Sequence, residues 1–443
     1  MDQRFLEAAC ADLADLIEIG APSRESNLPV IARLEAHWRG LGWTARRMAL
    51  ADDGPPRANL LLARGDAPTV LFCCHVDTVP PGDPKLWTAS DGRPRTPVAW
   101  RGQVFGLGAS DTLGSAAVLD TLAAFGRLPG HAAVAFTADE EVGAVGAAQL
   151  VASGLIPRSV GLVVVCEPTE NRVVTGQKGY VPFDVIARDA VARDAPGAVP
   201  ADLVRTLVVV GQEAHSARPA TGRNALFEMA HDDDVELIQD TIALEIECRG
   251  VRNKVPGVAS IRYADMAGLL MDGTHHEVPL RVVLDFLRRM DALAGRLAES
   301  TDGRFDPPGV TLNVGSVSVQ GRDLVFACDA RHVPGVTPRE VLDAALAEAR
   351  AAFGEAGLRH PFAPLAPVWT EPDDAMRTAF ADCLEGCGKS AYTEAAVFAE
   401  AGFRTVIAGP GNLLVHRPNE HVDVAALHAG GELYVRLAAH AGR

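Results

Sequence analysis

Short, uninterrupted apolar runs alternate with helical patterns through the first third of the chain. The apolar runs cover residues 69–74, 132–137 and 161–166. The helical patterns cover residues 3–19, 28–41, 114–125 and 144–153. Strands that are apolar on both faces are typical of a sheet with helices on both sides. We therefore predict an α/β fold with a mixed, mainly parallel sheet covered by helices.

The pattern changes at about residue 180, where alternating strands and two amphipathic helices follow. The strands include residues 182–187 and 242–248, and the helices cover about 279–298 and 337–353. The stretch 188–202 is rich in Asp, Ala and Pro, which predicts a loop insertion. A Pro-rich stretch near 362–368 precedes a return to the first pattern. We predict a catalytic domain in two parts, 1–179 and 362–443, with an inserted α+β domain at 180–361.

The last part of the chain carries a helical pattern at 374–384 and a strand pattern at 405–408. Cys383 and Cys387 have the wrong spacing for a zinc knuckle, so we expect them on one face of a short helix. Cys73, Cys74 and Cys166 lie in apolar runs, where reduced thiols are expected to be buried.

Composition narrows the classes of partner. The 443 residues include 41 Lys and Arg against 57 Asp and Glu, a net charge of -16, without a basic cluster that could neutralise phosphates. We therefore expect no nucleic-acid partner. The acidic, amphipathic start and the lack of a long apolar stretch predict a protein that is not exported, does not bind membranes and is cytoplasmic.

Acidic residues and histidines follow the apolar runs. His75 and Asp77 come directly after residues 69–74, and alternate residues of an extended chain project to the same side. An imidazole can bind a metal ion through one nitrogen while a carboxylate accepts the other N–H. This pair therefore suits a metal ligand and its orienting partner. A loop histidine beside a solvated Asp is the alternative.

Three further positions fit the same chemistry. Asp111 ends the segment Gly106-Leu-Gly-Ala-Ser-Asp, where it stands in place of the third glycine of a dinucleotide-binding loop, so we do not expect such a loop. Glu140 and Glu141 follow residues 132–137. In an extended backbone they would point to opposite sides, one toward a metal ion and one toward a bound water. Glu167 follows the third run, and Pro168 fixes a turn after it.

The order of these motifs, followed by a distant segment that contains His416, is more specific than any one of them. In this order the chain resembles the co-catalytic zinc hydrolases, which include acetylornithine deacetylase, succinyl-diaminopimelate desuccinylase, aminoacylase and carboxypeptidase G. The resemblance covers essentially the whole chain. It implies a zinc-exopeptidase-like catalytic domain with an inserted lid domain.

The resemblance also implies two divalent metal ions, most simply zinc, with cobalt and manganese as alternatives. The ligands of one ion would be His75, Asp111 and Glu167, and those of the other Asp111, Glu141 and His416. A hydroxide that bridges the ions would be the nucleophile, and Glu140 would act as general base and then general acid. Asp77 would orient His75.

The inserted domain is expected to supply further groups. His215 lies in a segment similar to the lid motif of the family, which implies a hydrogen-bond donor to the oxyanion. Asn253, Arg331 and Arg218 are candidates for substrate binding, since an arginine can clamp a carboxylate. Thr393 and Gly411 lie in segments that resemble substrate-facing loops.

We expect an amidohydrolase that cleaves an N-acyl amino acid or a related small amide. The alternatives are a dipeptidase or carboxypeptidase of the same family, a specialised aminohydrolase of a non-peptide small molecule and, more remotely, a binding protein with the same fold. The inserted domain is longer than a simple four-stranded lid, so both a monomer and a homodimer that completes the site with His215 are open.

Overall fold

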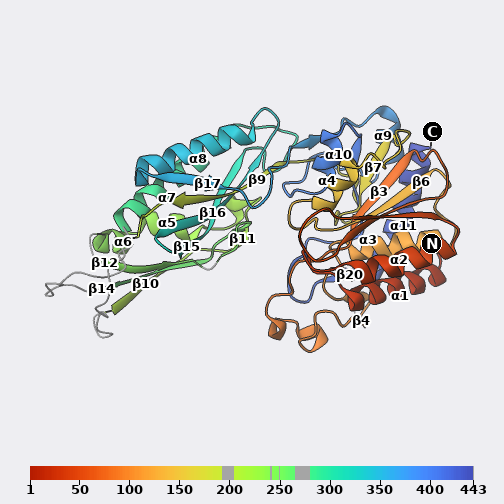
Figure 1. The fold of residues 1–443 in the computed structure, drawn as a ribbon, viewed down its shortest axis with the longest axis horizontal. Helices are drawn as coiled ribbons and strands as arrows, with labels where there is room; N and C mark the ends of the chain where they lie inside the picture. Colours follow the sequence, from red (N-terminus) through yellow and green to blue (C-terminus); the bar gives the residue numbers. More distant parts are fainter. Residues whose placement is uncertain (192–203, 240–241, 249, 265–279, 443) are drawn as a thin grey trace. The chain divides into compact units, whose positions relative to one another are not determined.

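The computed structural model describes residues 1–191, 204–239, 242–248, 250–264 and 280–442 (Figure 1). Most of the predicted loop insertion at 188–202 lies outside these residues. The chain forms two compact units, one of residues 1–177, 368–388 and 392–443, and one of residues 178–367 and 389–391. The predicted boundaries follow residues 179 and 361, and the two units divide after residues 177 and 367.

The first unit contains a six-stranded sheet in the order β1-β2-β6-β3-β7-β19. Its strands are β1 (Thr44–Ala49), β2 (Ala58–Ala63), β3 (Val70–His75), β6 (Ala132–Thr137), β7 (Leu162–Val165) and β19 (Thr405–Ile407). Strand β3 lies parallel to both β6 and β7, and β19 lies parallel to β7. Strand β2 is antiparallel to β1 and β6. The predicted mixed, mainly parallel sheet is confirmed.

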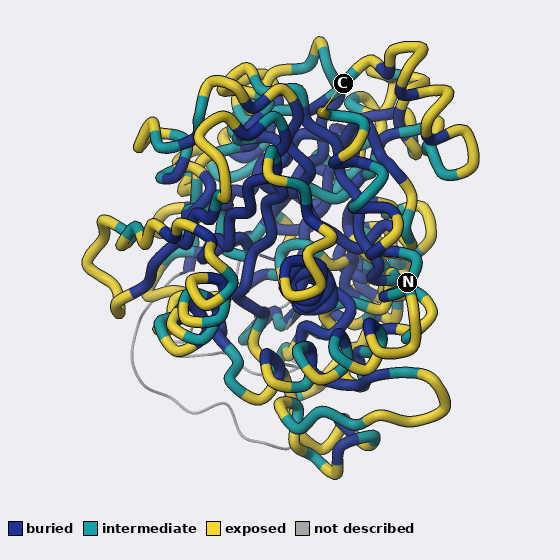
Figure 2. The backbone as a smooth tube through the Cα atoms, turned by 90° about the vertical axis from the view of Figure 1, so that its right-hand side faces the viewer, coloured by how far each residue is buried: buried dark blue, intermediate teal, exposed yellow. Residues whose placement is uncertain are grey.

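Helices cover this sheet. They are α1 (Gln3–Ile19), α2 (Leu28–Gly40), α3 (Leu113–Ala124), α4 (Val145–Ala152), α9 (Asp374–Ala379), α10 (Ala395–Glu400) and α11 (Val424–Ala441). Helices α1, α2, α3 and α11 share one core with alternate residues of the strands, such as Phe72 and Phe136. Helix α3 is buried along nearly its whole length, because its small residues allow close packing. Figure 2 shows such buried segments surrounded by exposed ones.

Short strands complete the unit. They are β4 (Val98–Trp100), β5 (Gln103–Phe105) and β20 (His421–Asp423) in one small sheet, and β8 (Gly176–Gln177) with β18 (Val368–Trp369) in another. The predicted helix at 374–384 is too long, because α9 ends at Ala379. The chain then turns so that Val173 pairs with Cys383 and Glu385 through main-chain hydrogen bonds. Cys383 and Cys387 therefore do not lie on a helix. The prediction of buried thiols at Cys73, Cys74 and Cys166 is confirmed.

The second unit has its own core. A four-stranded sheet has the order β15-β16-β9-β17, from β9 (Gly179–Ala187), β15 (Thr311–Gln320), β16 (Asp323–His332) and β17 (Ala356–Arg359). A three-stranded sheet contains β10 (Val204–Val210), β14 (Val258–Ala264) and β12 (Ile242–Glu247), and a two-stranded one contains β11 (Ala214–His215) and β13 (Lys254–Val255). The helices are α5 (Ala225–His231), α6 (Asp233–Ile238), α7 (Leu280–Ala298) and α8 (Pro338–Phe353). This α+β unit thus carries strands beyond a four-stranded sheet, as its length predicts.

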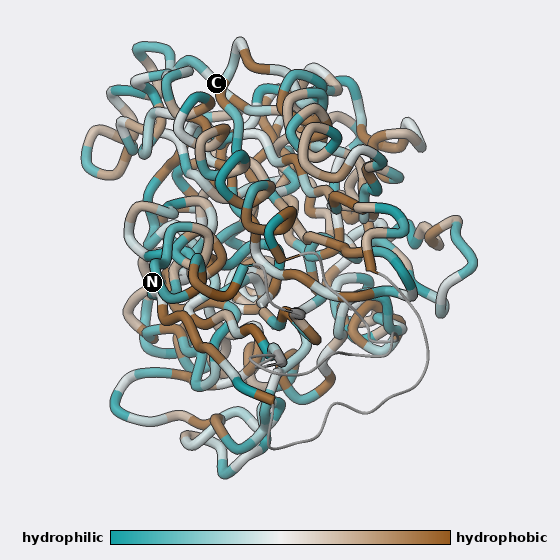
Figure 3. Tube along the Cα trace, turned by 90° about the vertical axis from the view of Figure 1, so that its left-hand side faces the viewer, coloured by the Kyte–Doolittle hydropathy of each residue, from teal (hydrophilic) through white to brown (hydrophobic). Residues whose placement is uncertain are grey.

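Hydrophobic stretches are interrupted by hydrophilic ones along the chain (Figure 3). Among the described residues, no helix is long and apolar enough to cross a membrane.

Candidate metal centre

The carboxyl ends of three neighbouring parallel strands bring acidic residues and a histidine to one edge of the large sheet. His75 is the last residue of β3 and lies opposite Thr137, the last residue of β6. Glu140 and Glu141 follow β6 after two residues, and Glu167 follows β7. Because β6, β3 and β7 are adjacent and parallel, their ends meet at the same edge. This position is where ligands bind in open α/β sheets.

Two loops complete the cluster. Asp111 lies between β5 and α3, and His416 lies between β19 and β20. His75 Nε2 is 3.7 Å from Asp111 Oδ2 and 3.6 Å from Glu167 Oε1. His416 Nε2 is 3.6 Å from Asp111 Oδ2 and 2.8 Å from Glu141 Oε1. The structure thus brings together all five predicted ligand residues, in two groups of three that share Asp111.

The geometry of both groups fits a divalent ion. Within each group the ligand atoms lie within 4.8 Å of one another. Ligand atoms bound at about 2.0–2.1 Å around one tetrahedral zinc ion lie roughly 3.3 Å apart, which is close to the separations here. Glu141 Oε1 is buried and lies 2.8 Å from His416 Nε2. Both residues belong to the second group of candidate ligands.

The negative charges of the cluster also favour the binding of cations. Asp111, Glu140 and Glu167 are buried, and Glu141 is nearly so. Burial raises the pKa of Glu140 well above its usual range, and the nearby Glu167 carboxylate raises it further. Burial also raises the pKa of Glu141, and the Asp111 carboxylate adds to that shift. Closely spaced buried carboxylates are stable when positive charge is placed among them.

Glu140 and Glu141 do not lie in extended chain, so that prediction is wrong. Strand β6 ends at Thr137, and Asp139 adopts a left-handed φ of 58°. The Glu140 carbonyl then accepts the N–H groups of Gly143 and Ala144 in a turn. The two side chains are therefore positioned by a turn and not by the alternating side-chain directions of a strand.

Asp77 holds this turn as well as His75. Its Oδ1 accepts the Glu140 N–H at 3.0 Å, and its Oδ2 accepts the Ser23 hydroxyl at 2.7 Å. His75 Nδ1 lies 3.0 Å from the Asp77 carbonyl oxygen and 3.4 Å from its Oδ1. The closer partner of the His75 ring is therefore the main chain of Asp77, and the carboxylate also ties the Glu140 turn to β3.

In the second unit, His215 and Asn253 lie next to each other. His215 pairs with Lys254 in the β11–β13 ribbon, and the Ser216 N–H donates to the Asn253 carbonyl. His215 is exposed, and the Ala217 N–H donates to its Nδ1 at 3.1 Å. An Nδ1 that accepts a hydrogen bond leaves the proton of a neutral imidazole on Nε2. The Nε2–H of His215 is thus a hydrogen-bond donor.

The two predicted arginines differ in exposure. Arg331 is 1% exposed, its Nε lies 3.4 Å from Asp329 Oδ2, and its guanidinium stacks 3.9 Å from the centre of the Tyr180 ring. Asp329 also accepts the Ser216 hydroxyl at 2.7 Å, which connects Arg331 to the segment after His215. Arg218 is exposed and pairs with Asp306 at 2.7 Å.

Thr393 and Gly411 are both explained by packing. Thr393 is buried and donates its hydroxyl to Gln177 Oε1 at 2.6 Å. Gly411 lies against the loop of Asp111, since a Cβ there would be 1.6 Å from the Ser110 carbonyl oxygen. Neither contact involves an exposed surface.

Two buried carboxylates near the cluster have no predicted role in the sequence. Glu420 accepts hydrogen bonds from the backbone beside Asp111, and Glu394 accepts one from Cys73 at 3.3 Å. The only sequence feature that could have marked Glu420 as a candidate is its position four residues after His416. Nothing in the local sequence of Glu394 marks it.

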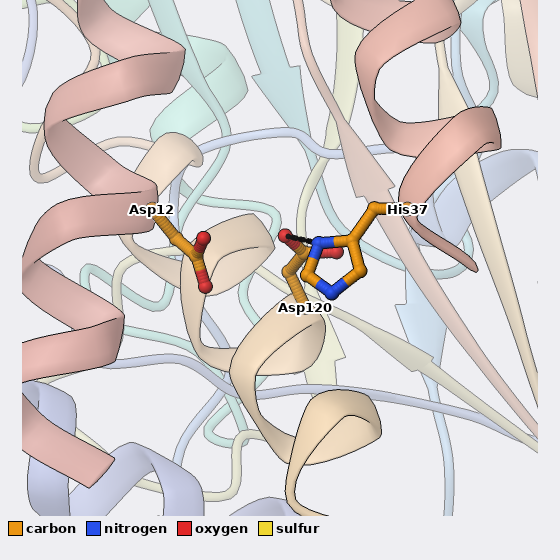
Figure 4. Close-up of side chains that lie close together, drawn as sticks. All are labelled: Asp12, His37 and Asp120. Carbon is orange, nitrogen blue, oxygen red and sulfur yellow. Dashed lines mark ion pairs between the residues drawn. The ribbon is translucent and has the colours of Figure 1, made fainter. Parts of the chain in front are cut away.

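A third group, of Asp12, His37 and Asp120, also gathers potential ligands, from α1, α2 and α3 (Figure 4). Here a protein cation already balances the charge. The Arg33 guanidinium pairs with Asp12 at 2.6 Å and with Asp15 at 2.8 Å, and it also pairs with Asp120. We therefore interpret this group as an ion-pair network between helices.

Known proteins share the sequence pattern and the fold. The sequence model of peptidase family M20/M25/M40 matches residues 71–440. Acetylornithine deacetylase from Myxococcus xanthus is 26% identical over 461 residues, which cover 98% of this chain and 98% of that protein.

Two solved structures extend the comparison to the fold. Aminoacylhistidine dipeptidase from Vibrio alginolyticus has a TM-score of 0.61 and 17% identity, over 97% of this chain and 95% of that one. An M20 family metallo-carboxypeptidase from Sulfolobus solfataricus has a TM-score of 0.59 and 16% identity, over 100% of both chains. With the family match over most of its length, this chain belongs to peptidase family M20/M25/M40 and is a hydrolase of amide or peptide bonds.

Proposed function

We propose that the protein is a two-metal amidohydrolase that cleaves the amide bond of an N-acyl amino acid. The observation that carries this proposal is the pair of His and carboxylate groups that share Asp111, with the buried Glu140 beside them. The full-length similarity to an acetylornithine deacetylase supports the choice of substrate class.

Five residues would hold the two ions, zinc by preference, and these are His75, Asp111 and Glu167 for one and Asp111, Glu141 and His416 for the other. Ions bound there supply a water activated for attack and polarise the amide carbonyl. His75 and Glu141 are held in place by Asp77, through its main-chain oxygen and its carboxylate respectively.

Glu140 is proposed to move the proton. Its carboxylate belongs to neither group of ligands and interacts electrostatically with Glu167, His75 and Glu141. It would accept a proton from the attacking water and deliver it to the departing amine. The cleaved C–N bond then leaves a carboxylic acid and a free amine.

His215 is proposed to donate its Nε2–H to the oxyanion that forms on the amide carbonyl. The hydrogen bond to its Nδ1 supports this role, because it fixes the donor tautomer. Asn253 is proposed to contact the substrate beside it. Arg218 is exposed, which suits a clamp for the substrate carboxylate, whereas the burial of Arg331 suits support of the His215 segment through Asp329.

A dipeptidase is the second candidate. The second unit carries a three-stranded sheet in addition to its four-stranded one, and the fold extends over nearly all of an aminoacylhistidine dipeptidase. Both activities use the same cleavage chemistry and differ in the acyl group that is removed.

Release of free amine from a substrate panel tests the proposal. The panel contains N-acetyl and N-succinyl amino acids, dipeptides and carbamoyl compounds. The protein is loaded with zinc or cobalt, with a chelated sample and Glu140→Gln as controls. We expect chelator-sensitive release from the N-acyl amino acids. Cleavage of dipeptides alone would establish the second candidate, and cleavage of carbamoyl compounds alone a specialised aminohydrolase.

A further inference from the structure

We propose that Glu420 is a positioning residue of the metal centre, because its buried carboxylate holds the backbone that presents Asp111. The inference rests on the two-ion site proposed above. Glu420 lies directly before β20 and is 1% exposed. Glu420 belongs to neither group of ligands, so metal binding does not explain why its side chain is buried close to Asp111.

Both oxygens of Glu420 accept hydrogen bonds from one loop. Oε1 accepts the N–H groups of Ser110 at 2.9 Å and of Asp111 at 3.0 Å, and Oε2 accepts the N–H of Gly108 at 3.2 Å. The Gly106 N–H donates to the Glu420 carbonyl at 3.0 Å, next to the pairing of β20 with β5. A side chain that accepts three N–H groups through its two oxygens fixes the direction of each.

The loop has the conformation that these contacts need. Gly108 has a φ of 79°, and a Cβ at this position would lie 2.7 Å from Thr78 Cγ2. The glycine therefore lets the loop direct three N–H groups toward one carboxylate. A second contact holds the far side of the loop, where the Asn412 N–H donates to the Ser110 hydroxyl at 2.7 Å.

The consequence for the metal centre follows from Asp111. Asp111 is the residue that the two groups share, so a change in its backbone orientation moves a ligand of both ions. Glu420 and His416 also lie in one loop, between β19 and β20. Glu420 therefore holds two ligand-bearing segments, distant in sequence, at a fixed separation. Asp77 does the same for His75 and the Glu140 turn.

Glu420→Gln tests this role, because glutamine keeps the shape but replaces one acceptor oxygen with a donor that faces an N–H. We expect the dissociation constants of both ions to rise by about 10–100-fold, as for other groups that support metal ligands. At saturating metal, the KM for substrate should stay near the wild-type value. Metal affinity is measured without substrate, so this result is independent of whether the amide panel succeeds.

Asp120→Asn is the matched control. Asp120 is equally buried, pairs with Arg33 and His37, and lies on α3, the helix that follows the Asp111 loop. The Asp120→Asn substitution should lower the melting temperature and leave the affinities for both ions unchanged. Unchanged metal affinities in Glu420→Gln would overturn the proposal, as would equal losses in both variants.

Hydrogen exchange of the wild-type protein without metal gives a test that needs no variant. The amides of Gly108, Ser110 and Asp111 should be strongly protected, because each donates to Glu420. Exchange as fast as that of exposed loop amides would contradict the anchoring role even if Glu420→Gln failed to fold.

Discussion

His416 occupies a left-handed backbone conformation, with a φ of 60°. A non-glycine residue in this region costs roughly 1 kcal/mol, and such strain is common at functional sites. Here the strained conformation brings His416 Nε2 within 2.8 Å of Glu141 Oε1. The strained backbone of His416 thus lies at a proposed metal ligand.

Removal of the Glu140 carboxylate should separate chemistry from metal binding. Glu140→Gln is expected to keep both ions while the turnover number falls by about 10²–10⁴-fold, because it removes the proton shuttle and no ligand. Steady-state kinetics and elemental analysis on the same sample measure both quantities. Glu25→Gln, at an exposed position, is the control. Turnover near the wild-type rate would exclude Glu140 as the general base.

Loss of His215 should affect turnover more than metal binding. His215→Ala is expected to lower kcat by about 10²–10³-fold, the usual effect of removing one oxyanion donor. His231→Ala, an exposed histidine of the same unit that pairs with Asp291, should leave kcat unchanged. Equal kcat values for His215→Ala and the wild type would remove His215 from the mechanism.

A mixture of two variants with low turnover tests whether His215 acts in its own chain or in a partner chain. If His215→Ala and Glu140→Gln proteins regain activity when they are combined, each subunit of a dimer completes the site of the other. If the turnover of the mixture stays low, His215 acts within its own chain.

At the scale of elements, the sequence was sufficient to predict the central strands of the large sheet and most helices, but β1 and α11 were not predicted. Continuous apolar runs became β3, β6 and β7, and the helical pattern at 3–19 became α1. The metal ligands could be predicted because parallel strands place their carboxyl ends together. The turn at Glu140 and the early end of α9 could not, because both depend on partners distant in sequence, such as Asp77 and Val173. The role proposed for Glu420 could not be predicted for the same reason, because its contacts join segments that are distant in sequence.

The ion-pair network between α1, α2 and α3 should make stability depend on pH. The Asp120 carboxylate raises the pKa of His37 above its usual value. A raised pKa means that this stabilisation is fully present below about pH 6.5 and is lost as the pH rises through the folded-state pKa. The effect should be at most about 1 kcal/mol, since His37 is partly exposed.

Urea unfolding of the wild type and His37→Gln at pH 6 and pH 9 measures this dependence. The difference in unfolding free energy between the two proteins should be larger at pH 6 than at pH 9. The same difference at both values would show that His37 is not charged in the folded protein.

At the scale of the whole molecule, the metal centre should contribute to stability. Its ligands come from segments between residues 75 and 416, and without ions its carboxylates repel one another. An ion that binds only the folded protein adds about 2.7 kcal/mol at 100 times its Kd. Thermal unfolding should therefore occur at a lower temperature after chelation and recover when zinc is added. An unchanged melting temperature would mean that the folded protein binds no ion tightly.

The number of divalent ions that each chain binds is the most direct test of a centre with two metal sites. Elemental analysis is carried out on zinc-equilibrated protein after free ions are removed. We expect two ions in the wild type, two in Glu140→Gln and one in His416→Ala, because His416 belongs to only one of the two groups. A single ion in the wild type, or two ions in His416→Ala, would contradict a centre in which Asp111 joins two sites.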